Sequence, residues 1–132
     1  MNMSTDVTVK GGMDDVIEKV TNALKDQGFG ILTRIDVDTT LKAKIGEDFR
    51  PYVILGACNP KLAHQALSAR PDVGLMLPCN VTVEQNVEGE CLVRFIDPHA
   101  MMSFGDLGQD ETLTRVGGEA GEKIKKAAAA LG

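Results

Sequence analysis

The sequence predicts an α+β fold in which helices pack on one face of a mainly antiparallel sheet. Segments in which every second residue is apolar alternate along the chain with segments whose apolar residues recur every three or four positions. Two of the strand-like segments are joined by Glu88-Gly89, a short turn typical of antiparallel hairpins. The helical segments are amphipathic, so each has one face to bury against the sheet.

The first half of the chain predicts a strand, a helix, a second strand and a short helix. Residues 7–9 alternate as a short strand does. The apolar stripe of the following helix consists of Met13, Val16, Ile17, Val20 and Leu24. Gly28 is placed to end that helix in a left-handed conformation. Residues 29–37 alternate again and predict a strand with one face on the core, and residues 38–45 predict a short helix.

The middle of the chain predicts a central strand, a helix and a hairpin. Residues 52–57 are apolar on both faces, as in a strand covered on both sides. Asn59-Pro60 is an N-cap followed by proline in the first turn, and it begins a helix that reaches about Ala69. Residues 73–77 are either a short strand or an apolar loop packed on the core. Residues 79–83 and 91–95 then alternate as the two hairpin strands.

The C-terminal part predicts two helices. Asp97-Pro98 repeats the cap-and-proline signature and begins a short helix through Met102. An amphipathic helix is expected over residues 111–131, although the glycines at 117, 118 and 121 weaken its start. The apolar cluster of Met101, Met102 and Phe104 is expected in the core. It would alternatively face a partner subunit or a ligand cleft, because methionine adapts to irregular surfaces.

Composition and charge limit the classes of function. The 132 residues are 43% apolar and 25% charged, which suits one globular domain spanning residues 1–132. No segment reaches the run of about eighteen apolar residues that a membrane-spanning helix needs. The net charge is −5 and the basic residues are scattered, which argues against nucleic acid as a partner.

The N-terminal sequence and the cysteines bear on the compartment. Residues 1–6 lack the positive and apolar segments of a secretory signal, which favours a cytoplasmic location unless a leader has been removed. Three cysteines in such a chain are expected to be reduced thiols and not a disulfide framework.

Three stretches of the sequence, in the same order, resemble the signatures of a known family. They are Gly28-Phe29-Gly30-Ile31-Leu32 with Ile35-Asp36-Val37, then Tyr52-Val53-Ile54-Leu55-Gly56-Ala57-Cys58-Asn59-Pro60, then Gly74-Leu75-Met76-Leu77-Pro78-Cys79-Asn80-Val81. On these motifs the chain resembles the Domain of Unknown Function 302 family, and the match covers most of the chain up to about Asp97.

This resemblance implies a layout of strand, helix, four strands and helix, akin to one half of the TATA-binding protein fold and often found as a homodimer. The pattern above agrees if residues 73–77 are not a strand. No DNA binding is implied, because a fold does not carry a function. No activity is settled for the family, so the resemblance supplies none.

Two cysteines form the one group of residues in the sequence that suggests a chemically active site. Cys58 immediately precedes the N-cap Asn59, where the free amides of a helix N-terminus would lower the pKa of a thiol. Cys79 follows Pro78 and would meet Cys58 near one sheet end if their strands are neighbours. The pair would then bind a soft or borderline metal, anchor a cofactor, or cycle between dithiol and disulfide. The simpler interpretation is that both are small buried apolar residues.

The other polar candidates have simpler explanations. Cys91, in the hairpin, is expected to be structural. His64 and His99 are expected at the surface, although either would complete a metal site with two cysteines. Glu84 shares one side of its strand with Asn80 and Thr82, and an outward, solvated polar face explains it.

Three functional hypotheses follow, and whether the chain is an enzyme stays open. The first is a binding module, expected to be homodimeric, whose cleft takes a metal ion or a small molecule and is lined by Cys58, Asn59, Pro78 and Cys79. The second is a thiol redox or sulfur-handling enzyme that uses the same two cysteines. The third is an interaction or scaffold domain in which the cysteines are inert.

Overall fold

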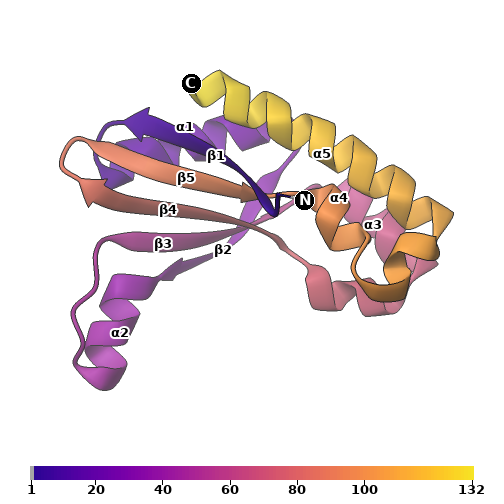
Figure 1. The fold of residues 1–132 in the computed structure, drawn as a ribbon, viewed down its shortest axis with the longest axis horizontal. Helices are drawn as coiled ribbons and strands as arrows, with labels where there is room; N and C mark the ends of the chain where they lie inside the picture. Colours follow the sequence, from indigo (N-terminus) through magenta and orange to yellow (C-terminus); the bar gives the residue numbers. More distant parts are fainter. Residues whose placement is uncertain (1) are drawn as a thin grey trace.

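The computed structural model describes residues 2–132 and has a five-stranded antiparallel sheet in the order β1-β5-β4-β3-β2. Figure 1 shows this sheet with the long helix α5 running across it. The strands are β1 (Ser4–Lys10), β2 (Gly30–Asp36), β3 (Tyr52–Cys58), β4 (Cys79–Val87) and β5 (Glu90–Ile96). The helices are α1 (Met13–Asp26), α2 (Val37–Ile45), α3 (Pro60–Ala69), α4 (Pro98–Met102) and α5 (Glu111–Leu131), with two 3₁₀ helices, η1 (Pro71–Met76) and η2 (Gly105–Gln109).

The core lies between one face of the sheet and the helices α1, α3 and α5, as the fold class predicted. In each of β3, β4 and β5, every second side chain is buried on this face, because alternate side chains of a strand point to opposite sides. The apolar stripe of α1 meets the same face, and Val16, Val20 and Leu24 are fully buried. Among residues 2–132, no helix combines the length and the apolar character needed to cross a membrane.

The edge strand β2 differs from its prediction. Its alternating pattern predicted one face on the core, but a bulge between Ile31 and Thr33 shifts the pairing with β3. A shift of one residue moves the following side chains to the opposite face. Ile31 therefore still packs against the core, whereas Ile35 is 48% exposed on the outer face. Helix α2 follows β2, buries none of its residues and extends away from the helix layer (Figure 1).

Packing decides the structure of two segments that the sequence left open. Residues 73–77 are not a strand: Val73 is buried within η1, and Leu77 follows that short helix. Helix α5 runs without a break from residue 111 to residue 131 despite its glycines. Gly117 is buried where α4 crosses α5, and a methyl group placed on it would lie 3.1 Å from the Met102 Cβ. The glycine that weakens the helix by propensity therefore allows the close approach of α4.

Candidate functional site

A small apolar cavity of about 30 Å³ lies where the ends of β3 and β4 meet α3, α4 and α5. Apolar side chains from α3 and α5 form most of its wall. Three sulfur-containing residues are also among those that line it, namely Cys58, Cys79 and Met102. The cavity is therefore lined mainly by apolar residues, with these three sulfur-containing residues among them.

Strand pairing places the two cysteines at neighbouring positions of one sheet end. β3 and β4 are neighbours, and their register places Ala57 opposite Cys79. Cys58 is the last residue of β3, so it follows the residue that faces Cys79. The sequence predicted that the two cysteines meet if their strands are neighbours; the strands are neighbours, and the approach of the two thiols stays a prediction.

Asn59 begins α3 as predicted. Its side-chain Oδ1 accepts a hydrogen bond of 3.2 Å from the backbone amide of Leu62, and Pro60 occupies the first turn. Asn59 also contributes to the cavity wall. It thus joins the strand that carries Cys58 to the helix that covers the cavity.

The prediction that the helix N-terminus lowers the pKa of Cys58 is wrong. Burial raises the pKa of Cys58, although this thiol lies beside a helix N-terminus. Burial, and secondly the negative charge that Cys58 would carry, raises the pKa of Cys79 to about 11. Loss of hydration outweighs the partial charge of the helix end, where the Asn59 side chain already accepts from one of the free amides. Both thiols are therefore protonated at neutral pH and are weak nucleophiles.

Pro78 is not part of the cavity wall and lies on the outer face of the sheet. There it packs over Gly56, and a methyl group placed on Gly56 would lie 2.7 Å from the Pro78 Cγ and overlap the hydroxyl of Thr33. Pro78 therefore holds the entry to β4 against β3. It positions Cys79 from behind the sheet and is not among the residues that line the cavity, whereas the sequence had placed it in the lining of the cleft.

The cluster of Met101, Met102 and Phe104 is divided by the fold. Both methionines are buried, as expected, but Phe104 is 68% exposed and does not belong to the core. Only Met102 of the two methionines lines the sulfur-bearing cavity. The methionine repeat identified the cluster, but no local signal distinguishes which of two adjacent residues faces a cavity.

The remaining cysteine and both histidines lie elsewhere. The thiol of Cys91 is buried, 3.6 Å from the carbonyl oxygen of Gly11 and 3.8 Å from the Met13 sulfur, which supports a structural role. His64 and His99 are exposed at the surface. Within residues 2–132, no group of three or more His, Cys, Asp or Glu side chains is arranged to hold a metal, which removes the site built from two cysteines and a histidine.

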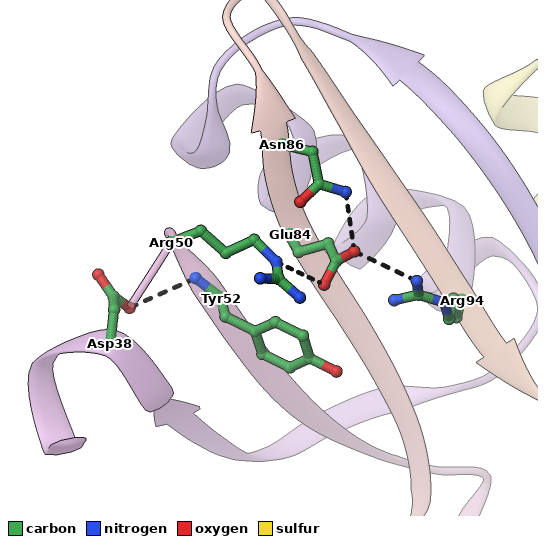
Figure 2. A network of polar contacts seen from close by, with 6 residues as sticks. All are labelled: Asp38, Arg50, Tyr52, Glu84, Asn86 and Arg94. Atoms are coloured by element: carbon green, nitrogen blue, oxygen red, sulfur yellow. Dashed lines mark hydrogen bonds and ion pairs between the residues drawn. The ribbon is translucent and has the colours of Figure 1, made fainter. Parts of the chain in front are cut away.

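The outer face of the sheet carries a polar network that the sequence did not predict (Figure 2). Glu84 is buried and not solvated: its carboxylate accepts from Asn86 at 3.0 Å, Arg94 at 3.2 Å and Arg50 at 3.4 Å. Burial alone would raise the pKa of Glu84, but the hydrogen bonds from Arg94 and Asn86 outweigh it and hold that pKa below its ordinary value. The arginines come from β5 and from the segment before β3, so the network ties three adjacent parts of the sheet.

Comparison with known proteins identifies the family. The family model described as "Domain of unknown function DUF302" matches residues 5–131. The chain belongs to the DUF302 family. The crystal structure of an uncharacterized conserved protein DUF302 from Bacillus stearothermophilus is similar to this DUF302 chain over 100% of both chains, with a TM-score of 0.87 and 26% sequence identity. None of the curated proteins matches the chain. The family confirms the resemblance seen in the sequence motifs and adds no activity.

Proposed function

We propose that this DUF302 chain is a binding module that holds one soft metal ion between Cys58 and Cys79. The observation that supports it is that two cysteines, distant in sequence, are among the residues that line one mainly apolar cavity. Sulfur ligands favour soft ions such as Cu⁺ over hard ions such as Mg²⁺. An ion displaces the thiol protons, so a raised pKa weakens binding without preventing it.

The size of the cavity favours an ion over an organic molecule. Its volume of about 30 Å³ exceeds the roughly 10–15 Å³ that one water requires. Typical small-molecule pockets are about ten times larger, at roughly 300 Å³ or more. The two raised thiol pKa values also argue against the thiol redox alternative, which needs an accessible thiolate.

Titration with Cu⁺ tests the proposal. The reduced protein, kept free of oxygen, competes with a chromophoric Cu⁺ chelator, and we expect one ion per chain. The Cys58→Ser, Cys79→Ser double variant should bind at least 100-fold more weakly, because both sulfur ligands are lost. Because protons are displaced, the affinity of the parent should rise as the pH rises from 6 to 8, by roughly tenfold per pH unit for each proton released.

Cys91→Ser is the matched control, since it removes a buried thiol outside the cavity. It should bind Cu⁺ as the parent does. Circular dichroism establishes that each variant is folded. Undiminished binding in the double variant would refute the proposal, and so would an absence of binding in the parent, which would favour the scaffold alternative.

We also propose that the chain forms a homodimer through the edge formed by β2 and α2. Within the described residues, β2 pairs on one side only, and its exposed residues include Leu32 at 66% and Ile35 at 48%. An unpaired edge strand with apolar side chains is a template for pairing with a second chain.

Light scattering coupled to size exclusion tests this assembly. The parent is expected at twice the mass of one chain, and Leu32→Lys, Ile35→Lys at the mass of a single chain, because buried charge opposes pairing. Val87→Lys changes an exposed apolar residue on the β4–β5 hairpin and should leave the mass unchanged. A parent that elutes as a monomer at all concentrations would refute the dimer.

A further inference from the structure

We propose that the thioether of Met102 is the third ligand of the site, and that the site selects a soft monovalent ion, Cu⁺, over Zn²⁺. This inference rests on the proposed function, because it assigns a further ligand and an ion class to the same cavity. It departs from the sequence analysis, in which only Cys58 and Cys79 were considered as metal ligands.

The first step is the position of Met102. It ends the short helix α4 and is 3% exposed, and it lines the cavity together with Cys58 and Cys79. Its Cβ and Cγ lie over Gly117, each 3.1 Å from the point where a side-chain carbon of residue 117 would be. Gly117 lines the same cavity. The missing side chain on α5 thus leaves the space through which the methionine reaches the cavity.

The second step is the coordination that the cavity allows. Zn²⁺ in proteins takes four ligands, or three with a water. Among the described residues, no His, Asp, Glu or further Cys gathers with the two thiols to supply the missing ligands. Zn²⁺ would therefore be left short of ligands.

The third step is the match between ion and donors. Thiolate and thioether sulfur are the donors that select Cu⁺, whereas Cu²⁺ prefers nitrogen and oxygen in a tetragonal arrangement. Cu⁺ is satisfied by two or three sulfur ligands and needs no water. Two cysteines and one methionine in a mainly apolar wall provide such a set, and the side-chain oxygen of Asn59, which also lines the cavity, already accepts from the Leu62 amide.

Met102→Leu tests the third ligand, and Met101→Leu is its control. The two methionines are adjacent and equally buried, at 3% and 4% exposure, but Met101 does not line this cavity. Leucine has nearly the volume of methionine, so both variants should fold. We expect Met102→Leu to weaken Cu⁺ binding by at least about tenfold, since one soft donor is lost, and Met101→Leu to change it less than about threefold.

X-ray absorption of the Cu⁺ form supplies a second readout. The parent is expected to show three sulfur neighbours around copper, and Met102→Leu two. Equal Cu⁺ affinities for Met102→Leu and the parent, or only two sulfur neighbours in the parent, would overturn the third ligand while the proposed function stands. Zn²⁺ binding as tight as Cu⁺ binding would overturn the ion class. Retention of Cu⁺ by the Cys58→Ser, Cys79→Ser variant would instead refute the proposed function itself.

Discussion

Gly56→Ala is expected to lower the free energy of unfolding by about 3 kcal/mol, the upper end of the cost of overpacking a well-packed site. The added methyl group would lie 2.7 Å from the Pro78 Cγ and overlap the Thr33 hydroxyl. Thr33 could turn aside, but the ring of Pro78 is held by the backbone that enters β4. The backbone that leads into β4 would have to shift, and Cys79, the first residue of β4, would shift with it.

Thermal and urea unfolding measure this effect, with Gly30→Ala as the matched control. Gly30 begins the edge strand β2, and a methyl group there would meet nothing within 4 Å. That variant should stay within about 1 kcal/mol of the parent, since glycine in a strand offers no packing to lose. For Gly56→Ala the melting temperature should fall by roughly 10 °C. Equal stability of the two variants would show that Pro78 does not constrain this face.

Glu84→Gln is expected to lower the free energy of unfolding at pH 7 by about 2 kcal/mol, the scale of hydrogen bonds to a charged group. Glutamine keeps the shape of the side chain but removes the charge that Arg94, Asn86 and Arg50 satisfy. Both arginines are partly exposed and can regain water, which keeps the loss below that of a fully buried broken pair.

The pH dependence of stability provides the specific check. The pKa of Glu84 is lower in the folded chain than its ordinary value of 4.5, so the folded state favours the charged form. This contribution is fully present above about pH 5 and is lost as the pH falls through the folded pKa. Urea unfolding between pH 7 and pH 3 should show the parent losing its advantage over Glu84→Gln on acidification. Glu88→Gln, in the exposed hairpin turn, should follow the parent, and a difference between parent and Glu84→Gln that persists at pH 3 would contradict the assignment.

Several features of the fold depend on neighbours in the chain, and these were predictable from sequence. The caps are the clearest case: Asn59 bonds to the amide of Leu62 and Asp97 to that of His99, over distances of 3.2 and 3.0 Å. Such interactions span two or three residues and leave a fixed signature. The Glu88-Gly89 turn, with Gly89 at a φ of 86°, is equally local. Together with the helical and strand periodicities, these signals determined the α+β class.

The candidate site depended on pairing that the sequence could only state as a condition. Cys58 and Cys79 both line the cavity because β3 and β4 are adjacent in a register that sets Ala57 opposite Cys79. Many strand orders are compatible with the same pattern of apolar residues. The bulge in β2 shows the same limit, since one extra residue moved Ile35 to the outer face without altering the alternation that predicted its burial.

By itself, the sequence determined the class of fold, the ends of its helices and the residue types available for chemistry. Only the tertiary structure decided that Cys58 and Cys79 have raised pKa values, that Met102 and not Met101 lines their cavity, and that Glu84 is buried among arginines. The physical reason is that hydration and packing at one atom are set by side chains brought from distant parts of the chain. The local sequence pattern around a residue therefore does not reveal the combined effect of these distant side chains.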